Sequence, residues 1–247
     1  MRINSINNAV NIIECFTVDN IEIGVSEIST QLNMHKSTVH HIIKTLHSEG
    51  ILVRTSSRKY RLGSRLLGWG ERVSKQYTPF FNASPYLDEL VRKTNETVHL
   101  AIQENDKVSY LAKVEPKKTV KIKTAIGTQL PVWCTGLGKM LLATQPGLDY
   151  SKVYDIPLEP YTENTITSHE QLVKELEKIS QQGYSIDNQE YEIGLYCIAV
   201  PIKDFLGNTV AAISISGPEF RICNRNIDFY LSTLHSTAKR ISEYCEL

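Results

Sequence analysis

The sequence predicts an α+β protein with a small, basic N-terminal part and a larger C-terminal part in which antiparallel strands are flanked by helices. Apolar residues recur with helical spacing in 9–16 and 39–46. Alternating runs at 97–103 and 107–114 are joined by a short polar turn, as in a β-hairpin. Residues 33–75 contain nine Lys and Arg but two acidic residues, although the whole chain is balanced at 27 of each. The split indicates a basic module that binds a polyanion and a second module with another role.

The N-terminal part is predicted to begin with two short helices and a tight turn. The first helix has an apolar stripe that includes Ile12 and Phe16. The second begins at about Ser26, whose side chain favours the N-cap position, and reaches Leu32. Asn33 is expected to take the turn because asparagine tolerates a positive φ angle.

The third helix is the most informative segment of the chain. It ends at Gly50, a residue that suits the left-handed position after a helix. The opposite face from its apolar stripe carries hydrogen-bonding side chains and no acidic ones, which suits a DNA major groove. The alternative is an ordinary solvated face. The apolar stripe consists of Val39, Ile42, Ile43 and Leu46.

Two short strands at 51–53 and 60–62 bracket a basic, polar tip after this helix. Together with the helix-turn-helix order of the preceding elements, this hairpin predicts a winged helix-turn-helix that binds double-stranded DNA. The candidates for reading bases or nearby phosphates are Ser37, Thr38, His40, His41 and Lys44. The candidates for holding the phosphate backbone are Lys36, Arg54, Arg58, Lys59 and Arg61.

A linker helix is predicted from Ser64 to about Tyr77, and Pro79 marks its end. We therefore expect the DNA-binding domain at 1–63, the linker at 64–79 and a second domain at 80–247. In the second domain we expect helices at 80–94, 136–142, 168–182 and 224–244. The expected strands are 97–103, 107–114, 120–125, 184–188, 197–203 and 209–216.

The cysteines and the hydropathy pattern exclude several classes of protein. The five cysteines are scattered without a Cys-x-x-Cys pair, which disfavours a disulfide framework or a structural zinc site. No apolar run approaches the roughly 20 residues that span a bilayer, and the N-terminus shows no signal-peptide pattern. We expect a cytoplasmic protein with no metal, no cofactor and no membrane partner.

The stretch KSTVHHIIKTLHSEGILVRTSSRKYRLG at 36–63 resembles the DNA-binding half of the IclR family of transcriptional regulators. The second half is similar to the same family through five ordered motifs. These are ETVHLAI at 96–102, PVWCTGLGKMLLA at 131–143, TITSHEQL at 165–172, GYSIDNQEYEIGLYCIAVPI at 183–202 and ISISGP at 213–218. The resemblance covers essentially the whole chain.

The resemblance implies a winged helix-turn-helix joined by a helix to a GAF-like effector-binding domain. It also implies homodimers, often paired into tetramers, and control by a small metabolite, frequently a carboxylic or sugar acid. Two positions depart from the family pattern. Trp133 stands where a histidine is common, and Tyr196 where an arginine is common. The identity of the ligand is therefore not carried over from a relative.

The turn at 134–139 is not a phosphate-binding P-loop, because Met140 replaces the required Ser or Thr and the glycine spacing differs. Glycines at the start of a helix still expose backbone N–H groups that favour an anion. In the family this turn lines the effector pocket, so Gly136 and Leu137 are candidates for amide contacts to a carboxylate. An ordinary tight turn is the alternative.

Strand alternation places Ser214 and Ser216 on one face of 209–216 and apolar residues on the other. Their hydroxyls need partners, which a polar ligand, the backbone or solvent could supply. By family position these two serines, Asp187 and Cys197 correspond to pocket residues. Asp187 would accept hydrogen bonds from ligand hydroxyls and Cys197 would form a small wall. The expected apolar contacts are Ile122 and Leu130.

The leading prediction is a ligand-responsive transcriptional regulator, most simply a repressor of a catabolic operon controlled by a small organic or sugar acid. A metabolite-binding protein or enzyme whose N-terminal module only dimerises is the alternative from another class. A non-specific DNA-associated protein is a third. A nucleophilic pair of Cys134 or Cys197 with His99 is disfavoured because nothing near either cysteine indicates an activated thiolate.

Overall fold

The computed structural model describes residues 3–117, 122, 124–145, 147, 150–223 and 227–244. The chain forms two compact units, Met1–Gln76 and Tyr77–Leu247. No helix within the described ranges is both long and apolar enough to cross a lipid bilayer.

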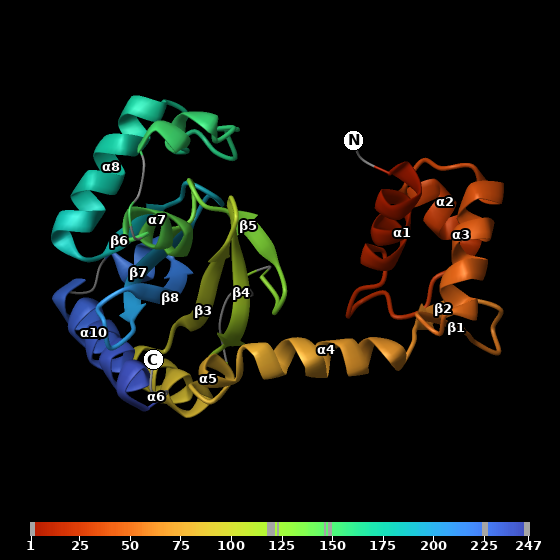
Figure 1. Ribbon diagram of the computed structural model, residues 1–247, viewed down its shortest axis with the longest axis horizontal. Helices are drawn as coiled ribbons and strands as arrows, with labels where there is room; N and C mark the ends of the chain where they lie inside the picture. Colours follow the sequence, from red (N-terminus) through yellow and green to blue (C-terminus); the bar gives the residue numbers. More distant parts are fainter. Residues whose placement is uncertain are drawn as a thin grey trace. The chain divides into compact units, whose positions relative to one another are not determined.

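The N-terminal unit is a helix-turn-helix followed by a two-stranded hairpin (Figure 1). Its helices and strands are α1 (Asn4–Glu14), α2 (Val25–Gln31), α3 (Lys36–Ser48), β1 (Leu52–Arg54), β2 (Tyr60–Leu62) and α4 (Arg65–Gln76). Ile12, Ile28 and Ile43 from the three helices meet in one small core with Leu52 of the hairpin. The expected apolar stripes therefore pack against one another, which leaves the polar face of α3 exposed.

The turn residues behave largely as their chemistry predicts. Asn33 has a φ of 51° between α2 and α3, and Gly50 has a φ of 70° after α3. The start of α2 was predicted wrongly. Its N-cap is Gly24 and not Ser26, because the Glu27 carboxylate reaches back to accept the N–H of Gly24 at 2.6 Å.

The C-terminal unit contains one antiparallel six-stranded sheet with strand order β5-β4-β3-β8-β7-β6. The strands are β3 (Thr97–Glu104), β4 (Lys107–Val114), β5 (Gln129–Pro131), β6 (Ser185–Asn188), β7 (Leu195–Lys203) and β8 (Thr209–Pro218). The helices are α5 (Thr78–Phe81), α6 (Ser84–Thr94), α7 (Gly136–Ala143), α8 (His169–Gln182), α9 (Glu219–Ile222) and α10 (Ile227–Tyr244), with a 3-10 helix at Tyr150–Asp155.

Helices cover both faces of this sheet (Figure 1). Leu87 of α6 and Leu234 of α10 pack with the β8 residues Ile213 and Ile215 on one face. On the other face α7 and α8 pack in a second cluster that includes Ala212 of β8. Strand alternation in β8 thus separates the two layers, as predicted, and the unit is an α+β domain.

Several predicted boundaries differ from the structure. The helix expected at 80–94 is two helices, α5 and α6, and Pro79 lies in the first turn of α5. The strand expected at 120–125 falls partly outside the described residues, and Ile122, Thr124 and Ala125 are not in a strand. The short β5 was missed, as were α9 and the 3-10 helix. Residues 224–226 of the expected last helix also lie outside the described part of the chain.

Candidate functional site

The exposed face of α3 carries all six side chains of that helix that were predicted to contact DNA. Val39, Ile43 and Leu46 are buried, which turns the rest of the helix outward. The exposed side chains are Lys36, Ser37, Thr38, His40, His41 and Lys44. Their donors and acceptors stand on one convex surface with no acidic side chain among them, an arrangement that a major groove accommodates.

The hairpin presents exposed arginines beside this helix. Arg54, Arg58 and Arg61 are exposed, and Arg58 occupies the turn with a φ of 63°. Lys59 differs, because its ammonium forms a 2.9 Å ion pair with Glu27 of α2. That ion pair lowers the pKa of the Glu27 carboxyl group, which also accepts a backbone hydrogen bond. This attachment of the hairpin to α2 was not predicted from the sequence, since the two residues lie far apart in the chain.

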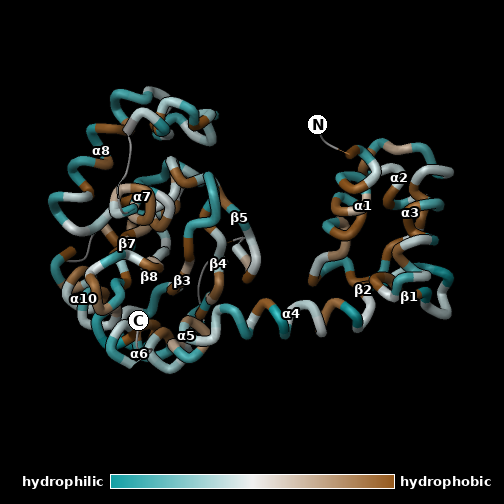
Figure 2. Tube along the Cα trace, in the orientation of Figure 1, coloured by the Kyte–Doolittle hydropathy of each residue, from teal (hydrophilic) through white to brown (hydrophobic). Residues whose placement is uncertain are grey.

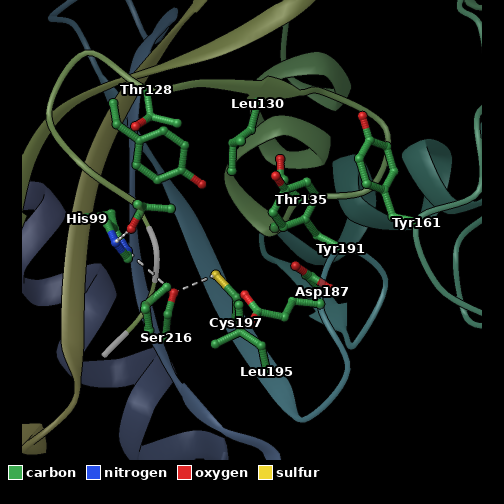
Figure 3. A pocket seen from close by; sticks show the side chains of 15 residues that line it. His99, Thr128, Leu130, Thr135, Tyr161, Asp187, Tyr191, Leu195, Cys197 and Ser216 are labelled. Carbon is green, nitrogen blue, oxygen red and sulfur yellow. Dashed lines mark hydrogen bonds between the residues drawn. The ribbon is translucent and has the colours of Figure 1, made fainter. Parts of the chain in front are cut away.

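The C-terminal unit contains a cavity of about 360 Å³ beside the start of α7. Figure 3 shows side chains from the sheet and the neighbouring loops directed into it. Its described lining residues are His99, Tyr110, Ile122, Thr124, Thr128, Leu130, Thr135, Gly136, Tyr161, Asp187, Tyr191, Glu192, Leu195, Cys197 and Ser216. The volume suits a small metabolite.

The N-terminus of α7 forms one side of the cavity. Thr135 is the N-cap, and its hydroxyl accepts the N–H of Gly138 at 3.1 Å. The N–H groups of Gly136 and Leu137 have no acceptor among the residues that the structure describes. A side chain at 136 would place its Cβ 3.0 Å from Cys197 Sγ, so glycine permits the close approach of β7 to this turn. The backbone here offers donors to a negatively charged group.

Asp187 lies at the end of β6 with 3% of its surface exposed. Its Oδ1 accepts the N–H of Glu190 at 2.8 Å, which stabilises the turn after β6. Burial raises the pKa of Asp187 to about 7, and the neighbouring Glu190 carboxylate adds to the rise. Burial therefore favours the protonated form of this carboxyl group.

A buried ion pair lies behind Asp187. The ammonium of Lys139 in α7 is 1% exposed and pairs with the carboxylate of Glu190, with Glu175 of α8 at 3.4 Å. The pair joins α7 to the turn that positions Asp187. This ion pair was not predicted from the sequence, because a lysine in the middle of a Gly-rich turn and helix gives no local sign of burial.

His99, Ser216 and Cys197 form a hydrogen-bonded row across β3, β8 and β7 (Figure 3). The Ser216 hydroxyl donates to Cys197 Sγ at 3.1 Å, and His99 Nε2 lies 2.7 Å from the hydroxyl of Thr124. Burial lowers the pKa of the His99 imidazole to about 3. Burial, together with the charge of Asp187, raises the pKa of Cys197 to about 12. The row is electrically neutral, and its thiol is a poor nucleophile.

Three tyrosines add aromatic walls that the sequence analysis did not predict. Tyr110 comes from β4, Tyr161 from the loop before α8 and Tyr191 from the turn after β6. The rings of Tyr161 and Tyr191 lie 5.0 Å apart. Their two segments are joined, because the Thr162 and Thr165 hydroxyls donate to the carbonyl oxygens of Gln189 and Glu190, each at 2.6 Å.

Six of the eight predicted effector-binding residues line the cavity, namely Ile122, Leu130, Gly136, Asp187, Cys197 and Ser216. The side chain of Leu137 is instead packed in the cluster beneath α7. Ser214 is fully buried in the sheet opposite His99 and Ala199. Trp133 and Tyr196, the two departures from the family pattern, are not among the described lining residues.

Comparisons with known proteins cover both units. The family model for the bacterial transcriptional regulator IclR C-terminal domain matches residues 79–243, and the IclR helix-turn-helix domain model matches residues 5–56. The HTH-type transcriptional regulator KdgR of Escherichia coli (strain K12) is 34% identical over 90% of this chain and 85% of its own. XynR of the same organism, also an HTH-type transcriptional regulator, is 30% identical over 97% and 96%.

Solved structures agree in fold over nearly the full length. The crystal structure of IclR from Thermotoga maritima has a TM-score of 0.78 at 30% identity and covers 100% of both chains. An IclR homologue from Microbacterium hydrocarbonoxydans, complexed with 4-hydroxybenzoate, has a TM-score of 0.80 at 27% identity and covers 97% of this chain and 98% of its own. With its helix-turn-helix, its α+β domain and these matches, the chain belongs to the IclR family of bacterial transcriptional regulators.

Proposed function

We propose that this protein is a cytoplasmic repressor that binds operator DNA through α3 and the hairpin and is controlled by a small organic or sugar acid bound in the cavity beside α7. The observation that carries the proposal is the pairing of two surfaces in one chain. One is the acid-free, exposed polar face of α3. The other is a cavity at a helix N-terminus whose first backbone N–H groups have no acceptor among the described residues.

The two groups of candidate DNA contacts have different roles in this proposal. The side chains at the middle of α3, such as His40 and Lys44, read bases in the major groove. The arginines of the hairpin, such as Arg58, hold phosphates or enter the minor groove. Removal of a base contact should cost about 1–3 kcal/mol and relax one position of the operator.

A homodimer would place two α3 helices roughly 34 Å apart, on successive major-groove turns of a palindromic operator. Exposed apolar stripes support self-association of the N-terminal unit. Ile6 and Val10 of α1 are 58% and 50% exposed. On α4, which has no buried residue, hydrophobic and hydrophilic positions alternate (Figure 2), and Leu67 and Val73 are exposed. Apolar stripes of this kind are typical of helices that pack against a partner.

The effector class is supported by the cavity and by one solved relative. Apolar contacts from Ile122, Leu130 and Leu195 surround the polar groups described above. The relative complexed with 4-hydroxybenzoate binds an organic acid. A bound acid would bias the dimer between DNA-competent and incompetent forms, with a coupling of about 1–3 kcal/mol.

The first experiment is binding to the DNA upstream of the chain's own coding region and to a random duplex, at two salt concentrations. It is repeated with a panel of acids that includes 4-hydroxybenzoate and D-gluconate. Tight, sequence-selective binding that one acid weakens is the expected result. Equal affinity for both duplexes would instead favour a non-specific DNA-associated protein.

A turnover assay with the acids that bind separates the regulator from the alternative, an enzyme with a dimerising N-terminal module. We expect no product from the native chain, and binding that survives in Cys197→Ala. Product formation that disappears in this variant would favour the enzyme. The raised pKa of the buried Cys197 thiol argues against that outcome.

A further inference from the structure

The described charged residues that line the cavity are acidic, which disfavours the binding of an anionic effector. The described lining residues include two carboxyl groups, Asp187 and Glu192, but no lysine or arginine. His99 adds no positive charge near neutral pH, because its pKa is about 3. A carboxylate ligand at the N–H group of Gly136 would therefore also meet the buried carboxyl group of Asp187, which lines the same cavity.

Among the residues that the structure describes, two lysines lie close to this wall, Lys139 and Lys113, and both are engaged by other groups. Lys139 pairs with Glu190 inside the domain, where its side chain is 1% exposed. Lys113 forms a 2.8 Å ion pair with Glu115 and donates at 2.7 Å to the backbone carbonyls of 122 and 124. Neither ammonium is available to offset the charge of a ligand without the loss of an existing carboxylate contact.

Burial, followed by the Glu190 carboxylate, raises the pKa of Asp187, whereas the N–H groups of Glu190 and Tyr191 and the Lys139 ammonium favour its ionised form. The titratable groups that interact with it are Glu190 in the turn after β6 and Lys139 in α7, together with Cys134 before α7, Cys197 in β7 and Tyr110 in β4, whose pKa values the charge of Asp187 raises. Only Lys139 among them is cationic, and Glu190 partly neutralises it. A second negative charge in the cavity would add to the repulsion that ionised Asp187 already experiences.

We propose that Asp187 is neutral in the ligand complex and donates its carboxyl proton in a hydrogen bond to an oxygen of a bound carboxylate, so that binding of an anionic effector takes up a proton from solvent. The inference rests on the proposed function, which assigns an acid to this cavity. The proton stays on Asp187, and no covalent bond changes. The donor–acceptor pair is a charge-assisted hydrogen bond, and Gly136 and Leu137 supply further donors.

This role is opposite to that of a carboxylate that accepts hydrogen bonds from ligand hydroxyls. Hydroxyl donors would stabilise ionised Asp187, so the affinity of a neutral polyol would rise with pH. An anion stabilises protonated Asp187, so its affinity falls as pH rises above the midpoint of the free protein. The fall approaches about tenfold per pH unit when one proton is taken up.

The test follows Asp187 directly in the full-length protein by NMR, with ¹³C in the aspartate carboxyl groups and ¹⁵N in glycine. Asp187→Asn identifies the Asp187 signal. Formate is the probe, because it stays ionised from about pH 5.5 to about pH 8.5 and has no hydroxyl group. Ionic strength is matched with chloride. We expect a midpoint near 7 without formate, an upward shift with formate, and a formate-dependent shift of the Gly136 amide.

Two variants sharpen the result. Asn at 187 can still accept the Glu190 N–H and offers an N–H₂ donor that does not titrate. Formate affinity should therefore persist in Asp187→Asn and lose its pH dependence. Glu192→Gln is the matched control, because Glu192 is the other lining carboxylate but is exposed. This control should keep the pH dependence.

Three results would overturn the inference. They are a midpoint of Asp187 below about 5, a midpoint that formate leaves unchanged or lowers, and the absence of any formate effect on Asp187 and Gly136. Operator binding by the same sample is measured in parallel. Selective operator binding with any of these three results would leave the proposed regulator intact and reject only the role of Asp187.

Discussion

Lys139 shows how a single buried charge supports the effector cavity. Its ammonium is 1% exposed, and it faces Glu190, whose side chain is 9% exposed. Removal of one member of such a pair leaves the other charge buried without compensation. We expect Lys139→Met to lower the free energy of unfolding by about 3–5 kcal/mol, measured by urea denaturation of the full-length protein.

The matched control for this prediction removes both charges. Lys139→Met/Glu190→Gln removes the buried carboxylate together with the ammonium and leaves only the partly exposed Glu175 without its partner, so it should be clearly more stable than Lys139→Met alone. Equal loss of stability in the single and double variants would show that packing at 139, and not its charge, stabilises the domain.

Individual residues of the cavity differ in how far they could be predicted. Gly136, Asp187, Cys197 and Ser216 were predicted because they lie within sequence motifs, and each lines the cavity. Tyr161 could not be predicted in this way, because it lies in a loop and meets Tyr191 only after the chain has folded. No local pattern encodes an encounter between such distant segments.

At the scale of elements, the hairpin allows two neighbouring cations to be compared. Arg58 is exposed at the turn, whereas Lys59 is paired with Glu27. Arg58→Met should weaken binding to all DNA sequences alike and lower the salt slope by about one. Lys59→Met should lower that slope by clearly less, because Glu27 already offsets its charge. Fluorescence anisotropy at several salt concentrations measures both slopes.

Equal slopes for the two variants would contradict this expectation and would mean that Lys59 leaves Glu27 when DNA binds. Glu27→Gln provides a further check, because it frees Lys59 without any change in the hairpin's own residues. If the ion pair withholds Lys59 from DNA, this variant should have a steeper salt dependence than the native chain.

Elements with strong periodicity were predicted well, and short or nonlocal ones were not. The apolar stripe of α3 and the alternation of β8 each fix which face is buried, so these elements follow from the sequence. β5 has only three residues, too few to show an alternating pattern, and it is defined by its hydrogen-bonded pairing with β4. The predicted start of α2 was wrong because the N-cap is a glycine, Gly24, whose N–H donates to the side chain of Glu27 three residues later.

For the whole molecule, the proposed homodimer makes the apolar stripe of α1 essential for tight operator binding. Val10→Asp places a charge on a position that is 50% exposed, so the fold should persist while the dimer dissociates. We expect a monomer in analytical ultracentrifugation and operator affinity close to that for a single half-site. Loss of the dimer removes one of the two linked recognition helices.

Phe205→Asp is the matched control, because Phe205 is 84% exposed in the turn between β7 and β8. It should leave both the dimer and the operator affinity unchanged. A Val10→Asp variant that remains dimeric and binds its operator normally would show that α1 does not contribute to the interface.

The hydroxyl bonds that join the loop before α8 to the turn after β6 have a kinetic consequence. Tyr161 and Tyr191 lie on segments held together by Thr162 and Thr165. Thr165 also accepts the N–H groups of Tyr161 and Thr162 at 3.0 and 2.9 Å. We therefore expect the two rings to move together, so that loss of these hydroxyl bonds would change the rate at which a small molecule leaves the cavity.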